Sequence, residues 1–137
     1  MRCSAGLLAL LLAAPAAQAA ERLPLVVGGQ TIQVEVAATP QARQRGLMGR
    51  TYLPADSGML FVFEAPGRHC FWMHDTPLPL SIAFMDVSGR VVGFADMQPR
   101  TDALHCPPDE IRYALEIAQG SFLRPQLAPG SRVQGLP

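Results

Sequence analysis

Lysine is absent from this 137-residue chain, so eleven arginines alone balance its eleven acidic residues. The arginines are dispersed along the sequence, which argues against the clustered basic face that nucleic-acid binding requires. Long apolar runs are also scarce, because the N-terminal run is too short to cross a bilayer comfortably and no second one follows. We therefore expect no nucleic-acid partner and no stable membrane insertion of the processed chain.

Several catalytic motifs are missing as well. The sequence has no Cys-x-x-Cys pair, phosphate-binding loop, nucleophile elbow or zinc-protease motif. Ser57, Ser81 and Ser88 have no patterned histidine and aspartate partners. The motifs therefore predict no particular reaction.

The first nineteen residues have the pattern of a secretory signal peptide. Arg2 supplies a positive start, residues 7–14 are apolar, and Ala17-Gln18-Ala19 is a small-x-small cleavage site. Cys3 precedes the apolar run, so it is not placed to carry a lipid anchor. We expect residues 1–19 to be removed and residues 20–137 to form one periplasmic or secreted domain.

Short apolar or alternating runs separated by turn residues predict a mainly β domain. Hairpins are expected at residues 23–36 and 81–95, because each range holds two strand-like runs around a glycine-containing turn. Six to eight short strands with one short helix indicate a small β-sandwich or a partly closed barrel. The other strands are expected at residues 58–63, 69–73, 113–117 and 132–133, the helix at 40–45 after the N-cap Thr39, and one helical turn at 122–126.

The stretch from Cys70 to Leu80 contains the only tryptophan of the chain. We interpret Trp72 as the core anchor of the strand at residues 69–73. Pro77 and Pro79 exclude a helix or a central strand beyond it, so the strand is expected to end in a rigid corner.

Cys70 and Cys106 are the only cysteines left once the signal peptide is removed. An even number of cysteines in an oxidising compartment favours pairing, so a structural disulfide is predicted. The alternative is a redox-active pair, but the close spacing that lowers a thiol pKa is missing.

Histidine and methionine near these cysteines suggest a periplasmic copper site, because imidazole and thioether are suitable copper ligands. His69 and His105 each precede a cysteine, and Met73 and His74 follow Cys70 closely. Adjacent strand residues face opposite sides, however, and methionine commonly fills gaps in a core. We therefore expect no metal and no other cofactor.

Glu116 lies in an apolar strand, on the face opposite Tyr113 and Leu115. It therefore either faces water or is buried and requires a cation. Arg45 and Arg50 flank the exit of the short helix and are candidate partners. Such an ion pair is either structural or orients the carboxylate or hydroxyl groups of a ligand.

These residues define a candidate groove. Two glycines let residues 46–50 approach the proline corner, with Glu116 between them. Trp72 is then an apolar floor with polar groups at the rim, whereas the alternative is a wholly buried tryptophan beside an ordinary loop. The candidate ligand-binding residues are Arg45, Arg50, Trp72, His74, Asp75, Thr76 and Glu116.

Several motifs in the same order resemble the family known as domain of unknown function 192. They are Arg45-Gly46-Leu47-Met48-Gly49-Arg50, residues 58–63, Phe71-Trp72-Met73 with Thr76, Pro79 and Leu80, then Phe84, and Tyr113-Ala114-Leu115-Glu116. The resemblance covers nearly all of the processed chain. It implies a compact, mainly β domain, often exported in bacteria, with no established activity, substrate or cofactor. His74-Asp75 and Ser81 depart from the usual pattern, which has an acid at the last position, so a catalytic role of that acid is not carried over.

The leading functional hypothesis is an exported ligand-binding or protein-interaction module of the cell envelope. The alternative is an envelope carbohydrate-active enzyme that uses Glu116 or Asp75 as acid or base, and the second alternative is the copper-binding protein. Two carboxylates in one cleft, one with a raised pKa, favour the enzyme. One carboxylate bound to an arginine favours the module.

Overall fold

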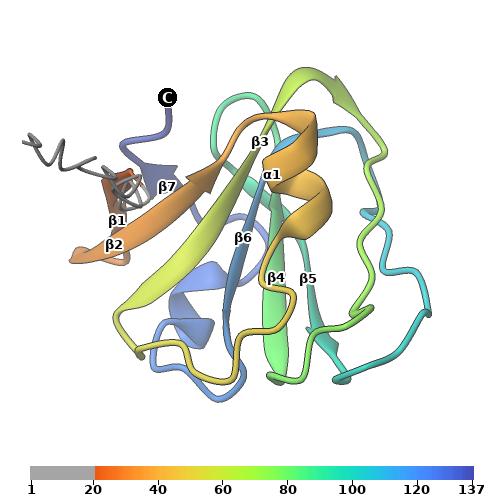
Figure 1. The fold of residues 1–137 in the computed structure, drawn as a ribbon. Helices are drawn as coiled ribbons and strands as arrows, with labels where there is room; N and C mark the ends of the chain where they lie inside the picture. Colours follow the sequence, from red (N-terminus) through yellow and green to blue (C-terminus); the bar gives the residue numbers. More distant parts are fainter. Residues whose placement is uncertain (1–20) are drawn as a thin grey trace, which may run out of the picture.

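A computed structural model describes residues 21–137, and the predicted signal peptide at residues 1–19 lies outside this range (Figure 1). No helix within residues 21–137 is long and apolar enough to span a membrane. The elements are β1 (Arg22–Val27), β2 (Gln30–Ala37), α1 (Pro40–Arg45), β3 (Ser57–Gly67), β4 (Leu80–Met85), β5 (Val91–Met97), β6 (Ile111–Ala118), the 3-10 turn η1 (Arg124–Leu127) and β7 (Val133–Gln134).

The seven strands form one strongly curled sheet with the order β5-β4-β6-β3-β2-β1-β7. All neighbours are antiparallel except β2 and β3, which are parallel and are connected through α1. The Val91 N–H donates to the Ser131 carbonyl (2.8 Å) and the Val133 N–H to the Gly89 carbonyl (2.9 Å), so the β7 segment meets the β5 end of the sheet. The predicted mainly β domain with one short helix is confirmed, and of the two forms expected, a sandwich or a partly closed barrel, the structure is the partly closed barrel.

The short elements follow from local sequence. Gly28 and Gly29 have φ of 56° and 79°, and this left-handed backbone reverses the chain between β1 and β2. The Thr39 hydroxyl accepts a hydrogen bond from the Ala42 N–H (3.1 Å), and Pro40 opens α1. β4 and β5 pair antiparallel around a turn in which Gly89 has φ of 81°, so both predicted hairpins and the predicted helix are confirmed.

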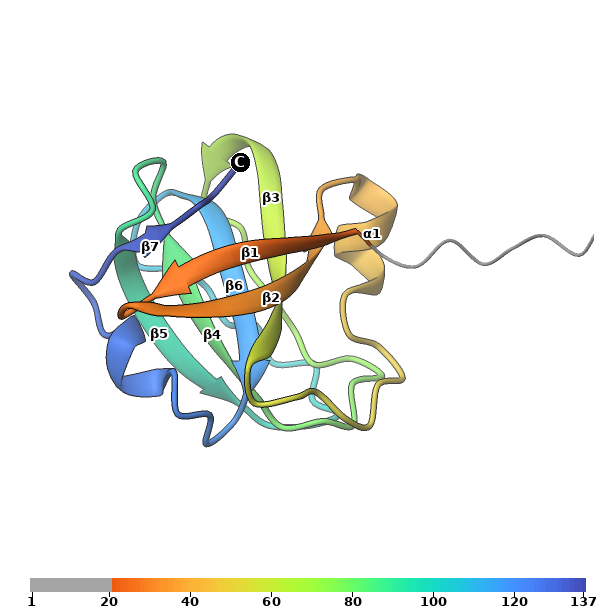
Figure 2. The ribbon, with the colours of Figure 1, turned by 90° about the vertical axis from the view of Figure 1, so that its left-hand side faces the viewer.

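Two hydrophobic cores occupy the two faces of the sheet. Alternation in β6 separates them, because Leu115 and Ile117 belong to the core inside the curl, whereas Ala114 belongs to the core on the outer face. Figure 2 shows α1 and η1 on opposite sides of the sheet. Leu127 of η1 packs in the inner core. The outer core is therefore the one that lies on the α1 side.

The segment around Trp72 differs from the prediction. Residues 69–73 form no strand, and Phe71 makes only an isolated antiparallel bridge with His105 (N to O 2.8 and 2.7 Å). Phe71 is 9% exposed and Met73 1%, whereas Trp72 is 40% exposed. The prediction that Trp72 anchors the core is wrong, because Phe71 and Met73, one residue to either side, fill the core positions.

The predicted disulfide joins Cys70 and Cys106 and is confirmed. Both cysteines are exposed, and they lie one residue outside the bridge between Phe71 and His105. The disulfide therefore ties two irregular segments of the chain that run past each other beside the outer face of the sheet (Figure 1).

Candidate functional site

A pocket of about 310 Å³ lies on the outer face of the sheet, between α1 with the turn that follows it and the segment around Trp72. The sheet supplies residues from β3 and β6, and the disulfide is at its edge through Cys70. The lining residues are Pro40, Arg43, Gln44, Arg45, Gly46, Leu47, Met48, Phe61, Phe63, Cys70, Phe71, Trp72, Thr76 and Glu116.

Glu116 supplies the acid of this pocket from the middle of the sheet. It lies opposite Met59 of β3 on one side and opposite Ile82 of β4 on the other. Its side chain is buried, with the whole residue 4% exposed, and its carboxyl group has no hydrogen-bond or ion-pair partner within residues 21–137. Burial raises the pKa of Glu116 to about 8. At neutral pH the group is therefore mostly protonated and can donate a hydrogen bond into the pocket.

Aromatic rings form much of the pocket wall. Phe61 meets Phe71 edge to face with ring centroids 5.1 Å apart, and Phe63 meets Phe71 in the same way at 6.0 Å. Trp72 adds its half-exposed indole. The wall therefore combines a rigid cluster of phenylalanines with one ring that solvent can reach.

Two arginines from the last turn of α1 line the pocket. Arg43 is held in place, because its guanidinium donates to the carbonyls of Ala38 (2.7 Å) and Val62 (3.0 Å) and stands 5.2 Å from the centre of the Phe63 ring. Arg45 is exposed and takes part in none of the ion pairs found within residues 21–137. Arg45 is therefore the cationic group available to a ligand.

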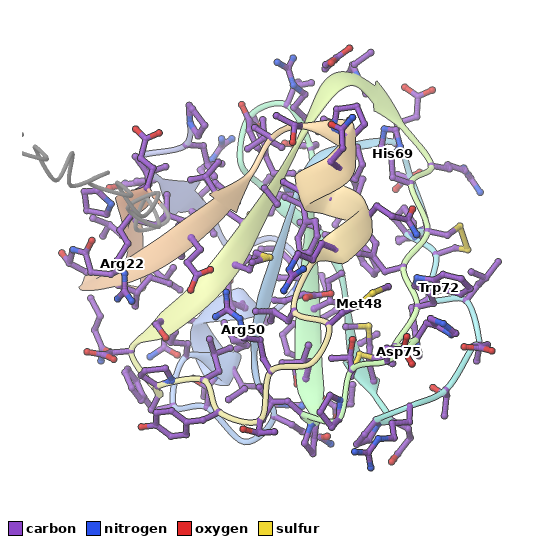
Figure 3. The ribbon with its side chains drawn as sticks, viewed as in Figure 1. Arg22, Met48, Arg50, His69, Trp72 and Asp75 are labelled. Atoms are coloured by element: carbon purple, nitrogen blue, oxygen red, sulfur yellow. A yellow bond between two sulfur atoms is a disulfide. The ribbon has the colours of Figure 1, made fainter. Side chains whose placement is uncertain are left out.

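Arg50 lies outside the pocket. Its guanidinium holds the two carboxylate oxygens of Glu35 at 3.0 and 2.7 Å, and this hydrogen-bonded pair lowers the pKa of Glu35. In Figure 3 Arg50 is well separated from Trp72 and Asp75, with Met48 between them in that view. Neither Arg50 nor Arg45 pairs with Glu116, so the candidate ion pair does not form.

The loop after α1 does pack against the proline corner. The Gly49 N–H donates to the carbonyl of Asp75 (2.8 Å), which fixes residues 46–50 beside the corner as the sequence predicts. Thr76 is buried and lines the pocket, and its hydroxyl donates to the carbonyl of His74 (3.0 Å). The corner therefore presents Thr76 to the pocket, with oxygen lone pairs free to accept.

His74 and Asp75 are not among the lining residues and instead support Trp72. The imidazole of His74 stacks on the indole of Trp72 with centroids 4.7 Å apart. Its Nδ1 bonds the Asp102 carboxylate at 2.8 Å, and Asp75 lies 3.4 Å from its Nε2. The hydrogen bond to Asp102 and the charge of Asp75 raise the pKa of His74.

Several lining residues were missed by the sequence analysis, among them Phe61 and Phe71. The apolar run of β3 was interpreted simply as a buried strand. Alternation carries the missing signal: Phe61 pairs with Ala114 and so shares the face of Glu116. What the sequence does not show is that α1 covers this face only partly.

The histidines considered for copper make other contacts. His69 stacks on Phe63 at 3.7 Å and bonds the carbonyl of Ala65, and His105 belongs to the bridge with Phe71. Within the described part of the chain, no three histidine, cysteine, aspartate or glutamate residues are grouped to hold a metal ion.

Comparisons with known proteins give a family and a fold. The family model for domain of unknown function 192, described as an uncharacterized ACR, matches residues 24–135. A structure from Sinorhizobium meliloti, described as that of a candidate transcription regulator, shares 30% identity over 83% of this chain and 92% of its own, with a TM-score of 0.76. A Novosphingobium aromaticivorans protein of unknown function shares 29% identity over 92% of this chain and 93% of its own, with a TM-score of 0.80. The chain has no match among curated proteins.

Proposed function

The chain belongs to the domain of unknown function 192 family, and we propose that it is an exported module of the cell envelope that binds a small organic molecule above Glu116. The observation that carries the proposal is the unpaired carboxyl group of Glu116 at the pocket. The protein supplies this group with no partner of its own, and a hydrogen bond formed in a desolvated pocket is stronger than one formed in water. A ligand that bonds the carboxyl group therefore gains an interaction for which no residue of the pocket competes.

The shape of the site supports a small ligand rather than a protein partner. A volume of about 310 Å³ is at the low end for small-molecule pockets, roughly 300–1,000 Å³. Rings on the wall and a few polar groups, Glu116, Thr76 and Arg45, are the usual composition of such sites. The exposed Trp72 gives the ligand a flat apolar surface at the pocket edge.

Export is proposed on two grounds. Residues 1–19 have the pattern of a signal peptide. The disulfide between Cys70 and Cys106 is exposed, and disulfides persist in oxidising compartments such as the periplasm.

A thermal-shift screen of the oxidised mature protein tests the binding proposal. A ligand that binds only the folded state raises Tm in proportion to its occupancy. Compounds that raise the Tm of the wild type should lose this effect with Glu116→Leu, which removes every hydrogen-bonding group at the position. Leucine suits the site because its neighbours across the strands are Met59 and Ile82.

The matched control is Glu35→Gln, which removes an acid of the same type outside the pocket. Glu35 pairs with Arg50 on the surface, so the variant should keep the ligand-induced rise in Tm. If no compound stabilises the wild type, or if Glu116→Leu responds equally, the binding proposal is wrong.

A carbohydrate-active enzyme is the second candidate, because a buried acid with a raised pKa in a pocket is what a general acid requires. Glycosidases, however, place two carboxyl groups across the scissile bond. Glu116 is the one acidic residue among the lining residues of this pocket, and Asp75 lies outside. The arrangement therefore supports binding over glycoside cleavage, and Glu116-dependent release of a chromogenic aglycone would reverse this ranking.

The regulator description of the Sinorhizobium protein is not extended to this chain. Regulators that bind DNA carry clustered positive charge, and this chain has eleven basic and eleven acidic residues, with arginines dispersed along it. Arg50 and Arg124 are moreover engaged by the carboxylates of Glu35 and Asp96.

A further inference from the structure

We propose that the pocket selects a small zwitterion, with the ammonium group of the ligand at Glu116 and its carboxylate at Arg45. This inference rests on the proposed binding function and names the ligand class of the same pocket. It combines a buried acid that lacks a cation with an arginine that lacks an anion, both at one cavity.

The ammonium half follows from the surroundings of Glu116. An ionised carboxylate in the interior requires a cation, and none of the residues 21–137 supplies one to Glu116. Phe61, Phe71 and Trp72 line the same cavity, and ring faces attract cations, whereas the Phe63 ring already has Arg43 over it. Carboxylate and rings together are therefore complementary to a desolvated ammonium group.

The carboxylate half follows from α1. A ligand with a positive charge alone would meet Arg43 and Arg45 on the wall, and like charges repel. Arg43 is already bonded to two carbonyls, whereas Arg45 has no ionic partner in the described chain. A carboxylate on the ligand converts the repulsion at Arg45 into a forked hydrogen-bonded pair.

The position of the two groups fits one short ligand. Glu116 comes from the sheet beneath the pocket, and Arg45 from the helix that lies over this face. The small cavity volume admits a chain of a few carbons between the two charged ends. The ligand therefore spans from the sheet to the helix.

Binding has a proton balance that identifies the ammonium group. In the free protein Glu116 is mostly protonated at pH 7. An ammonium ion favours the ionised carboxylate, so the carboxylic acid gives its proton to the buffer as the ion pair forms. A neutral ligand that only accepts a hydrogen bond leaves the proton in place. Proton release therefore separates the two kinds of ligand.

Three probes of similar length test the inference: 4-aminobutyrate, n-butylamine and butyrate. Isothermal titration calorimetry at pH 7 in two buffers of different ionisation enthalpy measures both affinity and proton release. We expect 4-aminobutyrate to bind at least about tenfold more tightly than either probe with a single charge, which is a difference of about 1.4 kcal/mol. We also expect it to release most of one proton per site.

Two variants assign the ends of the ligand. Arg45→Gln should lower the affinity for 4-aminobutyrate to that for n-butylamine. It should not lower the affinity for n-butylamine itself. Glu116→Gln keeps the shape and the hydrogen-bonding capacity of the side chain but should abolish proton release. The matched control is Arg50→Gln, which removes an arginine paired outside the pocket and should leave all three affinities unchanged.

The failure of this inference is distinguishable from that of the proposed function. Binding of 4-aminobutyrate without proton release, equal affinity for the three probes, or no binding up to millimolar concentration overturns the zwitterion. The proposed function still holds in each case if other compounds stabilise the wild type and not Glu116→Leu.

Discussion

Glu116 owes its unusual state to its place in the strand order. β6 lies between β3 and β4, and the residues beside Glu116 on these two strands are Met59 and Ile82. Neither side chain carries a charge that could form an ion pair with the acid. The carboxyl group is desolvated without compensation, and this raises its pKa to about 8. Glu116 thus adds a buried titratable group to the outer face of the sheet.

The first prediction concerns the pH dependence of stability. Burial raises the pKa of Glu116 from its ordinary value of 4.5 to about 8 in the folded protein, so the folded state binds more protons between these values. The free energy of unfolding should therefore fall by roughly 1.4 kcal/mol per pH unit from this residue as pH rises across that window. Urea unfolding at pH 5, 6, 7 and 8 should show a shallower pH dependence for Glu116→Gln.

The control for this prediction is again Glu35→Gln. The pKa of Glu35 is lowered below 4.5 by Arg50, so its contribution is gained above its unfolded pKa and lost only under acidic conditions. That variant should keep the wild-type slope above pH 5. Equal slopes for wild type and Glu116→Gln would show that the acid is not buried as described.

Sequence alternation was enough to assign Glu116 to the face opposite Tyr113 and Leu115. It was not enough to decide between water and burial, because that depends on what covers the face. The cover comes from residues 46–48 and the segment around Trp72, which have no periodicity to interpret. For the same reason the sequence favoured Trp72 over Phe71 as the buried ring, since a bulky residue in an irregular segment gives no sign of its direction.

At the scale of elements, β3 and β6 approach closely enough to require glycine. A Cβ atom at Gly58 would lie 2.6 Å from the backbone carbonyl oxygen of Glu116. This distance is too short for the two atoms, so the backbone of one strand would have to shift. This close approach fixes the strand that carries the acid relative to the strand that carries Phe61.

The second prediction is that Gly58→Ala separates β3 from β6. We expect a loss of about 1–3 kcal/mol in the free energy of unfolding, as for overpacked sites. The affinity for pocket ligands should fall too, because Glu116 moves with its strand. Ser57→Ala, which removes one hydrogen bond to the Pro54 carbonyl (3.0 Å), is the control in the same strand and should keep the affinity. An alanine variant as stable as the wild type would contradict this account.

The disulfide acts on a different pair of segments. It closes a loop with a sequence separation of 36 between the proline corner and the segment that carries Asp102. In the folded protein these segments are also joined by the bridge of Phe71 with His105 and by backbone hydrogen bonds from the Met73 N–H to the Thr101 carbonyl (3.1 Å) and from the Arg100 N–H to the Thr76 carbonyl (3.0 Å). In the denatured state these bonds are lost, and the disulfide alone restricts the segments.

The third prediction is that the double variant Cys70→Ser, Cys106→Ser loses about 3–4 kcal/mol of stability in the chain-entropy model. Hydrogen exchange should accelerate at the Phe71 and His105 amides more than in β6. A reductant should destabilise the wild type by a similar amount and leave the double variant unchanged. Two free thiols in the denatured, unreduced mature protein would contradict the pairing.

Over the whole molecule, the strands of the sheet could be predicted from the sequence, whereas the chain that covers the outer face could not. The hairpins and the buried strands carry glycine turns and regular alternation, so the mainly β class followed from the sequence, which left open whether the strands form a sandwich or a partly closed barrel. The cover of the outer face consists of α1 and irregular chain held by a disulfide and isolated contacts such as Gly49 with Asp75. Such contacts join residues far apart in sequence, which is why the sequence did not show that Arg50 pairs with Glu35 outside the pocket.

The last prediction concerns export to the periplasm and the formation of the disulfide there. Oxidation of Cys70 and Cys106 requires an environment that maintains disulfides, and cytosolic thiols are normally kept reduced. A chain expressed with its first nineteen residues should therefore be recovered from the periplasm with Ala20 as its N-terminal residue and with no free thiol. A version that starts at Ala20 behind an initiating methionine should remain in the cytoplasm, contain two titratable thiols and melt at a lower temperature until it is oxidised. N-terminal sequencing, thiol titration and thermal unfolding measure the three properties. Recovery of the full-length chain from the membrane fraction, or of reduced protein from the periplasm, would contradict export coupled to disulfide formation.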